Sequence, residues 1–419
     1  MNCLIITSPT TDKYVSQSSI FYLTTVLEST GYYYDILDMS GIVDYYDPPY
    51  YIYSKANRDL WCDSRVFDEL WIEKYIPRIT NRIYDRIYCS ALFSMDIIIQ
   101  GGYVAKYKEN NRNVRAYIGG PALHNLNNKQ LEVIKSVFDD VSIVYITGDP
   151  NYLTYEIKDF VTILSGSGCN WGKCRFCNSK KQKYQLKNRS KIINEFNKIA
   201  ELSTAEIMLS SDSIDVDSMR SLAKDLDSNK QPWNVMLRAD DKIDTNLAIS
   251  LHKSNCTDVF IGVEIFDNSG LRFIRKGSTV ETIKSTIINL SEQDIKVSIG
   301  LIMFLPAINE DQLKNQLLNL REILPYIDKI ELESLSVLYN SDFHINHNNY
   351  GIELFPKNNI IFDYWCYGLS PDIPWGFKNN DNLKMWLHHS NELKDVINDY
   401  VEPYYWWHID YIRESNDNT

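Results

Sequence analysis

The sequence predicts an α/β protein in which a doubly wound parallel sheet is followed by an open, partial barrel. Strand and helix patterns alternate along residues 1–155, and they alternate again, more regularly, along residues 156–340. Such alternation predicts parallel strands with helices packed on the faces of the sheet. Residues 341–419 break the pattern and are rich in aromatic side chains, so we expect three parts.

Apolar runs of strand length in residues 1–155 are separated by segments with helical spacing. We expect a Tyr- and Pro-rich loop over residues 44–54 and a helix over residues 58–85. The other expected helices are Ser16–Thr30, Met95–Asn110 and Gln130–Val137, and the expected strands are Asn2–Thr7, Tyr32–Leu37, Arg86–Ala91, Val114–Ile118 and Val141–Ile146.

Small residues follow four of these five strands. In open parallel sheets, ligands bind beyond the carboxyl ends of the strands, and small side chains let a flat ligand approach the backbone. Tight turns by themselves also favour such residues, but four turns together favour a pocket. The residues concerned are Ser8, Ser90, Gly119, Gly120 and Gly148.

Six apolar runs alternate with five helical segments in the second part of the chain. Six strands are too few to close an eight-stranded barrel, so we expect an open barrel with its functional groups at the carboxyl ends of the strands. The expected strands are Val161–Leu164, Ala205–Leu209, Trp233–Leu237, Asp258–Val263, Lys296–Ile302 and Lys329–Leu332. The expected helices are Ser190–Leu202, Val216–Leu226, Thr245–Ser254, Val280–Glu292 and Glu310–Leu324.

Three cysteines follow the first strand of this barrel on a loop rich in Gly and Ser. Cys169, Cys174 and Cys177 have the spacing C-x4-C-x2-C. Three thiolates can bind three irons of a 4Fe–4S cluster and leave the fourth iron open for another ligand. A structural zinc site normally has four protein ligands, and zinc here would need a distant one. We therefore expect an open iron–sulfur site.

Composition excludes several classes of protein. The formal net charge is −12, which disfavours binding to nucleic acid. No apolar stretch reaches the roughly 18 residues of a membrane helix, and the N-terminus has no basic segment of a signal peptide. The other cysteines are scattered, as expected for reduced thiols. We expect a cytoplasmic protein without a membrane or nucleic-acid partner.

The cysteine loop, with Phe176 before its last cysteine, resembles that of radical S-adenosylmethionine (SAM) enzymes, whose usual spacing has one residue fewer in the first gap. Residues 258–277 are similar to the G-x-E … K-G signature of the subfamily with a cobalamin-binding domain. Residues 118–121 and 148–149 resemble two glycine turns of that domain. The resemblance implies a Rossmann-like cobalamin-binding domain (1–155), a (β/α)6 radical SAM barrel (156–340) and a C-terminal part (341–419) that faces substrate or caps the barrel.

The same resemblance implies three cofactors, a 4Fe–4S cluster on the three cysteines, SAM, and cobalamin in the first domain. No D-x-H-x-x-G motif marks a histidine as a cobalt ligand, so a domain that has lost the cofactor stays an alternative. Glu264 and Arg238 are implied to bind polar groups of SAM, although Glu264 pairing with a lysine and Arg238 in an ordinary salt bridge are alternatives. The other implied SAM contacts are Phe176, Ser211, Ser298 and Gly300.

The expected reaction is cobalamin-dependent C-methylation of a peptide or a natural-product precursor, as the resemblance implies. A cobalamin-independent radical epimerisation or cyclisation is an alternative, with Cys366 quenching the substrate radical. For Cys366 a buried structural role is the other interpretation. A metal-binding regulatory protein without turnover is the alternative from a different class.

A cluster of basic residues surrounds the cysteine loop. Residues 173–191 carry eight Lys and Arg side chains in an otherwise acidic chain. By charge complementarity, this segment would dock an acidic electron donor such as flavodoxin or ferredoxin. A solvated loop and helix start is the alternative.

Overall fold

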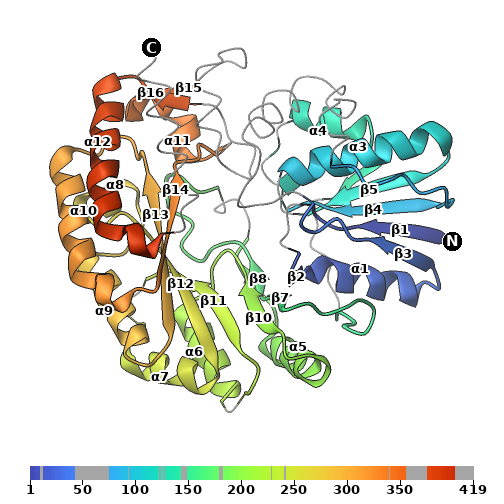
Figure 1. The fold of residues 1–419 in the computed structure, drawn as a ribbon, viewed down its shortest axis with the longest axis horizontal. Coiled ribbons are helices and arrows are strands. Elements are labelled where there is room, and N and C mark those ends of the chain that lie inside the picture. Colours follow the sequence, from blue (N-terminus) through green and yellow to red (C-terminus); the bar gives the residue numbers. More distant parts are fainter. Residues whose placement is uncertain are drawn as a thin grey trace. The chain divides into compact units, whose positions relative to one another are not determined.

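A computed structural model gives the structure of the protein. It describes residues 1–9, 13–42, 75–92, 94–120, 122–123, 126, 128–142, 149–178, 183–227, 229–239, 242–338, 340–354 and 375–401. These residues form two compact units (Figure 1), and the boundary along the chain lies between Val161 and Thr162. The second unit comprises residues 162–354 together with the described residues from 375 onward.

The first unit is built on a five-stranded parallel sheet with the order β3-β1-β4-β5-β6. In chain order this is the doubly wound 2-1-3-4-5 arrangement, whose ligand crevice lies at the switch point between the first and third strands. The strands are β1 (Asn2–Ile6), β3 (Tyr33–Leu37), β4 (Arg86–Ser90), β5 (Arg115–Gly119) and β6 (Asp140–Ser142), and the helices are α1 (Ser18–Ser29), α3 (Ser94–Asn110) and α4 (Asn128–Lys135). The predicted Rossmann-like sheet is confirmed.

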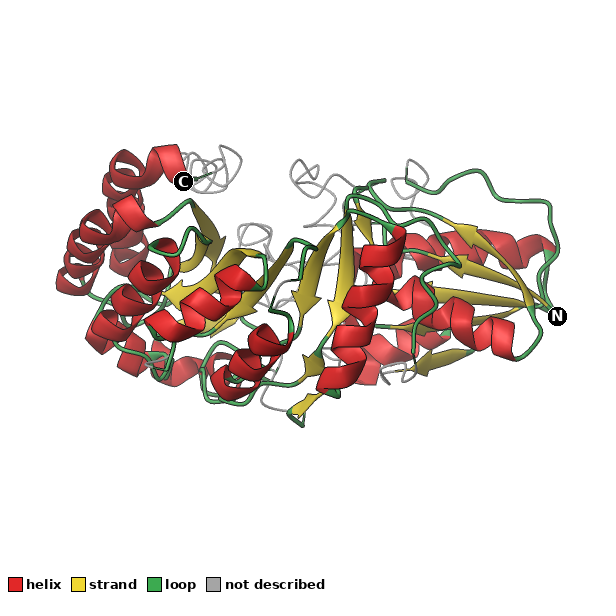
Figure 2. Cartoon of the chain, turned by 90° about the horizontal axis from the view of Figure 1, so that it is seen from below, coloured by secondary structure: helices red, strands yellow, loops and turns green. Residues whose placement is uncertain are grey.

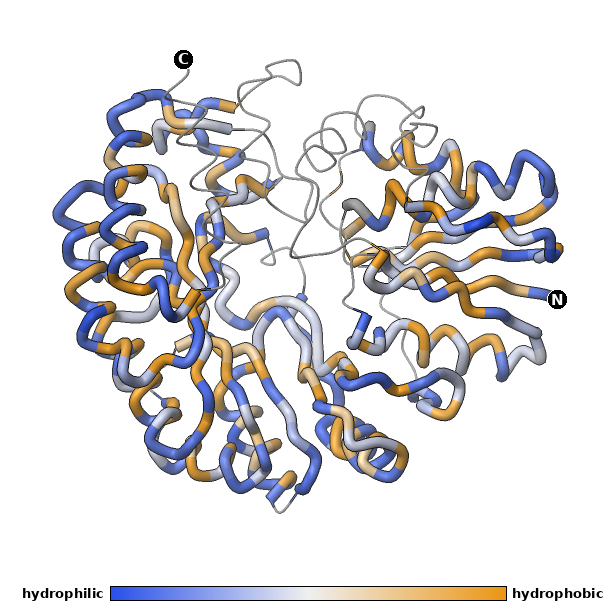
Figure 3. Tube along the Cα trace, in the orientation of Figure 1, coloured by the Kyte–Doolittle hydropathy of each residue, from blue (hydrophilic) through white to orange (hydrophobic). Residues whose placement is uncertain are grey.

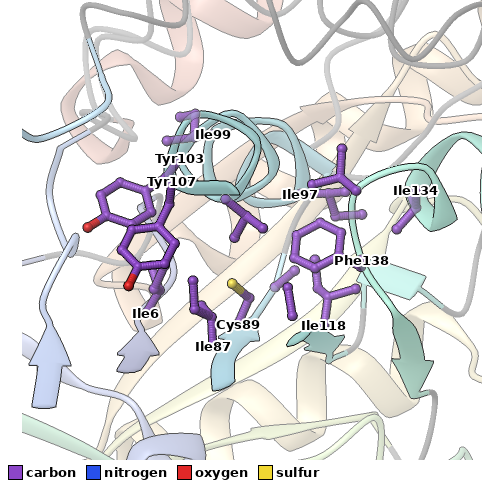
Figure 4. Packing of buried hydrophobic residues seen from close by; sticks show 14 of the residues in the cluster. Ile6, Ile87, Cys89, Ile97, Ile99, Tyr103, Tyr107, Ile118, Ile134 and Phe138 are labelled. Carbon is purple, nitrogen blue, oxygen red and sulfur yellow. The ribbon is translucent and has the colours of Figure 1, made fainter. Parts of the chain in front are cut away.

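The main core of this unit lies between its sheet and helix α3. Alternate residues of a strand point to one face, so Ile87 and Cys89 of β4 face the same way and are buried. Figure 4 shows them beneath Ile97 and Tyr103 of α3, with Phe138 closing one side. The opposite face has a smaller core, formed by Cys3, Ile5 and Leu27. A short strand, β2 (Val15–Ser16), pairs in parallel with Phe160 and Val161.

The predicted helix over residues 58–85 is wrong in the part that the structure describes. Residues 58–74 lie outside the described residues, and residues 75–85 form turns and extended chain. The backbone N–H groups there donate hydrogen bonds to distant parts of the chain. Tyr84 N donates to the Tyr107 hydroxyl at 2.9 Å, and Asp85 N donates to Asn2 O at 2.8 Å. Pro77 also cannot donate a helical hydrogen bond.

The second unit contains the predicted partial barrel. Its six parallel strands follow the order β14-β13-β12-β11-β10-β7, and Figure 2 shows them with helices outside them. The strands are β7 (Phe160–Leu164), β10 (Glu206–Ser210), β11 (Trp233–Leu237), β12 (Cys256–Glu264), β13 (Lys296–Met303) and β14 (Lys329–Ser334). The covering helices are α5 (Arg189–Leu202), α6 (Val216–Asp225), α7 (Thr245–Lys253), α9 (Val280–Ser291) and α10 (Glu310–Ile323). All eleven predicted elements are confirmed to within a few residues at their ends.

Side-chain caps start these helices. Asp215, Asp244 and Thr279 each accept a hydrogen bond from the backbone N–H three residues later. Asn309 forms a complete capping box with Gln312. The helices alternate between hydrophobic and hydrophilic stretches along the chain (Figure 3), as expected of amphipathic helices that cover a sheet.

The barrel is followed by further elements in residues 342–354 and 375–397, within the part of the chain where the sequence pattern breaks. They are α11 (Asp342–Ile345), a 3-10 turn (His347–Tyr350), β15 (Ile352–Leu354), β16 (Trp375–Phe377) and α12 (Asn380–Ile397). Helix α12 packs against α10, and its Trp386 is fully buried with Nε1 donating to Leu305 O at 3.0 Å. The described aromatic residues of this region therefore extend the core of the second unit. No described helix has the length and apolarity that a membrane span needs.

Candidate active site

The cysteine loop leaves the carboxyl end of β7 and is held there by hydrogen bonds. Ser165 donates to Ser210 O through both its N–H (2.9 Å) and its hydroxyl (3.0 Å). Gly168 N donates to Asp212 Oδ2 at 2.7 Å. The base of the loop is closed by β8 (Gly166–Ser167), which pairs in antiparallel fashion with β9 (Gln185–Leu186). The three cysteines lie between these two short strands.

The three thiols form a donor set that fits an iron–sulfur cluster. Cys169, Cys174 and Cys177 form no disulfide and are half-buried. Burial raises the pKa of the Cys174 thiol to about 12, and the neighbouring thiols act in the same direction while Lys276 opposes them. Among the described residues no three such side chains converge as around a single metal ion. A cubane is wider than one ion, and each thiolate binds a different corner.

Residues 274–277, which follow β12, contact the cysteine loop on both sides of Cys174. Arg175 N donates to Ile274 O at 3.0 Å, and Trp171 Nε1 donates to Arg275 O at 2.8 Å. The Trp171 ring also packs on Gly277, where a Cβ atom would lie 2.2 Å from ring atom Cζ2. Trp171 stands in the long first gap of the loop and was missed by sequence reasoning, because its partners lie about a hundred residues further along the chain.

The Arg175 side chain fixes the other side of the loop. Its guanidinium packs on the rings of Phe273 and Tyr350, 4.8 and 5.0 Å from their centroids, and its Nε lies 3.5 Å from Asp342 Oδ2. Phe343 N donates to Arg175 O at 3.2 Å. Residues 342–350 therefore help to shape the cysteine loop.

The structure pairs three of the eight basic side chains of residues 173–191 with carboxylates. Arg175, Lys187 and Arg189 are paired with Asp342, Glu195 and Asp225 respectively. Lys180 and Lys181 lie outside the described residues. Lys173, Lys183 and Lys191 are exposed, so part of the predicted positive charge faces solvent.

Glu264 ends β12 and forms a buried ion pair. Its Oε1 lies 2.6 Å from Lys276 Nζ, and Lys276 is only 7% exposed. Burial alone would lower the pKa of Lys276, but the Glu264 carboxylate raises it above its usual range. Glu264 has a φ of +70°, a conformation that costs energy for a residue with a side chain. Of the two sequence interpretations of Glu264, the pairing with a lysine is what the structure shows.

Two further predicted SAM contacts lie at the carboxyl ends of neighbouring strands. Arg238 follows β11 and stacks on Trp171 at 4.9 Å, with Ser278 Oγ 3.5 Å from its Nη1. Ser211 follows β10, and its buried hydroxyl has no hydrogen-bond partner among the described residues. A buried hydroxyl without a partner is costly, which fits a place where a polar ligand binds. Phe176 is half-buried within the loop itself.

The predicted contacts on β13 lie deeper in the barrel. Gly300 faces the ring of Phe260, and a Cβ atom there would lie 2.7 Å from ring atom Cζ. Ser298 is two residues nearer the start of the strand, and its hydroxyl donates to Asp258 Oδ2 at 3.0 Å. The structure therefore groups Phe176, Ser211, Arg238 and Glu264 around the cysteine loop, but it does not bring Ser298 to the strand ends.

The Asp258–Ser298 pair leads to a pH-dependent prediction. Burial raises the pKa of Asp258 from 3.8 to about 6, and the stability due to its proton is lost as the pH rises through that range. Asp258→Asn should therefore raise the free energy of unfolding by about 1–3 kcal/mol at pH 8 and by far less at pH 4. Urea unfolding at both pH values measures this. Asp217→Asn, at an exposed carboxylate, is the control, and an equal gain from Asp258→Asn at both pH values would contradict the assignment.

In the first unit, the predicted cofactor contacts gather at the ends of β1, β4 and β5. Ser8 Oγ donates to Asp96 Oδ2 at 2.5 Å, and Asp96 also accepts from Leu92 N at 2.8 Å. Ser8 and Ser90 are both buried. Gly120, next to Gly119, has a φ of +114°, and a Cβ atom there would lie 2.2 Å from Ala91 O. Gly148 and Cys366 lie outside the described residues.

Sequence reasoning missed Asp96 and Gln100, two buried polar residues of α3 at this switch point. Gln100 Nε2 donates to Thr7 O at 2.9 Å and to Ser90 O at 3.1 Å, which ties the ends of β1 and β4 together. Its Oε1 has no partner among the described residues. Asp96 and Gln100 are polar residues four apart on an otherwise apolar helix face, and this pattern could have revealed them.

Comparison with known proteins identifies the class of the second unit. Residues 163–317 match the Radical SAM superfamily, so the chain carries a radical SAM domain. Enzymes of this family use a 4Fe–4S cluster and SAM. No curated protein matches the sequence.

Solved structures extend the likeness to both units. TsrM from Kitasatospora setae, a radical SAM methyltransferase with cobalamin and a [4Fe–4S] cluster bound, superposes with a TM-score of 0.62 at 10% identity over 100% of this chain and 99% of its own. OxsB, a cobalamin-dependent radical SAM enzyme, gives 0.63 at 13% identity over 94% of this chain and 66% of its own. The protein thus has the fold of the cobalamin-dependent radical SAM enzymes.

Proposed function

We propose that the protein is a radical SAM enzyme that methylates carbon in a peptide or a natural-product precursor with the help of cobalamin. When bound, the cluster and SAM supply a 5′-deoxyadenosyl radical that abstracts hydrogen, and cobalamin supplies the methyl group. The observation that carries this proposal is the set of three thiols, none in a disulfide, on one loop at the carboxyl edge of a partial barrel. The superfamily match over residues 163–317 supports it.

The residues of the second unit have separate roles in this proposal. Cys169, Cys174 and Cys177 would hold the cluster, since they form no disulfide, are half-buried and lie on one loop. Arg238 and the unpaired hydroxyl of Ser211 would bind polar groups of SAM at neighbouring strand ends. These side chains are half-buried, which limits the competition of water for their hydrogen bonds.

Cobalamin fits the first unit on the geometry of its sheet. The strand order places the ligand crevice between β1 and β4, where buried Ser8 and Ser90 stand. Gly120 has no side chain to fill the neighbouring turn. Gln100 Oε1, which has no hydrogen-bond partner among the described residues, lies at the same switch point. The fold likeness to TsrM, which binds cobalamin, supports this part of the proposal.

An external electron donor completes the proposal. We infer an acidic one-electron donor such as flavodoxin or ferredoxin, because Lys173, Lys183 and Lys191 are exposed near the loop in sequence. Such chemistry requires a reducing compartment, and the cytoplasm provides one.

An absorption spectrum of the protein tests the two cofactors separately. Protein prepared without oxygen and supplied with iron, sulfide and hydroxocobalamin should show both iron–sulfur and corrinoid absorbance after desalting. With SAM and dithionite it should release 5′-deoxyadenosine. Iron–sulfur absorbance and 5′-deoxyadenosine without bound corrinoid would contradict the methylation proposal. Protein that shows no iron–sulfur absorbance and releases no 5′-deoxyadenosine would contradict radical chemistry altogether.

A further inference from the structure

The backbone around Lys276 is attached to the cysteine loop at three points. Ile274 and Arg275 accept hydrogen bonds from Arg175 N and Trp171 Nε1, and Gly277 packs on the Trp171 ring. The two hydrogen-bond donors stand on either side of Cys174 in the sequence. Lys276 lies between these attachment points, so its charge is held next to the loop that carries the thiols.

The Lys276 side chain is buried in a space that fits it and Glu264 closely. The side chains of Lys276 and Glu264 are 9% and 14% exposed, and their charged atoms are 2.6 Å apart. A Cβ atom at Gly262 would lie 2.7 Å from Glu264 Oε1 and 3.0 Å from Lys276 Nζ. Glycine at position 262 and the positive φ of Glu264 therefore make room for this pair.

Both charges of this pair lie beside the loop that carries the thiols. Lys276 is positive and Glu264 negative, and the residues on either side of Lys276 are bonded to or packed on the cysteine loop. Fixed charges in a buried environment interact more strongly than charges in water. The potential of an iron–sulfur cluster depends on the charges around it, because reduction adds one negative charge.

We propose that the buried Lys276–Glu264 pair sets the reduction potential of the cluster held by the neighbouring cysteines. The ammonium of Lys276 favours the reduced cluster and so eases the transfer of one electron from a low-potential donor. The carboxylate of Glu264 opposes this effect and holds Lys276 in place. This inference rests on the proposed function, because it requires that the three cysteines bind the cluster.

The test is a redox titration of the cluster followed by electron paramagnetic resonance, with reconstituted protein and without SAM. Lys276→Met removes a positive charge and should lower the midpoint potential. Glu264→Gln removes a negative charge and should raise it. Lys276→Arg keeps the charge and should stay near the wild type. Lys284→Met is the matched control, since it breaks the ion pair of Lys284 with Glu322 on the outer helices.

Opposite shifts in the Lys276→Met and Glu264→Gln variants would support the proposal, because structural damage alone does not predict opposite signs. Shifts in the same direction, or shifts no larger than that of Lys284→Met, would overturn it. If Lys276→Met fails to keep its cluster, Glu264→Gln decides alone, and an unchanged or lower potential overturns the proposal. Wild-type protein that binds no iron would instead overturn the proposed function.

Discussion

Replacing Cys174 by alanine is expected to abolish the cleavage of SAM and to remove most of the iron bound by the reconstituted protein. The three thiolates bind different corners of the cluster, so the loss of one cannot be shared by the other two. Residues 274–277 also hold the loop on both sides of Cys174, through hydrogen bonds and packing with Trp171 and Arg175. Iron content and the release of 5′-deoxyadenosine measure the effect.

Cys256→Ala provides the matched control for this variant. Cys256 is a free, buried cysteine at the start of β12 in the same unit. Its loss should leave the iron content and the release of 5′-deoxyadenosine near wild type. Full SAM cleavage by Cys174→Ala, or an equal loss in Cys256→Ala, would show that the cysteine loop does not hold the cluster.

Replacing Gly277 by alanine is expected to disrupt the cysteine loop without touching a cysteine. Gly277 has a φ of +80°, and the added Cβ would lie 2.2 Å from Trp171 Cζ2. The backbone strain and the overpacking together should lower the free energy of unfolding by about 2–5 kcal/mol. Iron content after reconstitution should fall as well, because Trp171 can no longer occupy its place beside the loop.

A double variant separates the two causes. In Trp171→Ala the clash is absent, so adding Gly277→Ala should cost only the backbone term, about 1 kcal/mol. Urea unfolding of the two single variants and the double variant gives the coupling between the two positions. A Gly277→Ala effect that is the same with and without Trp171 would contradict the packing described here. Gly351→Ala is the control, with a φ of +68° but no atom near the added Cβ.

The sequence was most informative about the barrel because each strand there is a short apolar run between turn residues. β11, for example, occupies the range that the sequence predicts, Trp233–Leu237. Helix α8 (Asn268–Phe273) was missed because six residues are too few to show a helical period. The predicted helix over residues 58–85 failed at the described residues 75–85, because their backbone bonds to other parts of the chain, which a local pattern cannot reveal.

The candidate site shows the same division between local and distant information. The cysteine spacing is local, and it led directly to the loop. The partners of the loop are distant, since Trp171 meets Gly277 and Arg175 meets Asp342. Asp342 is not marked by any pattern near Arg175. The basic side chains of residues 173–191 were therefore interpreted as a surface, although three of them are paired with carboxylates.

The packing of Arg175 on Phe273 and Tyr350 also bears on when the cysteine loop gains its contacts during translation. The cysteines leave the ribosome long before the residues that complete the shape of their loop, because Asp342 and Tyr350 come after the whole barrel. A nascent chain that has reached only β14 lacks these contacts. The loop that we propose to hold the cluster therefore gains all of these contacts only after translation has passed Tyr350.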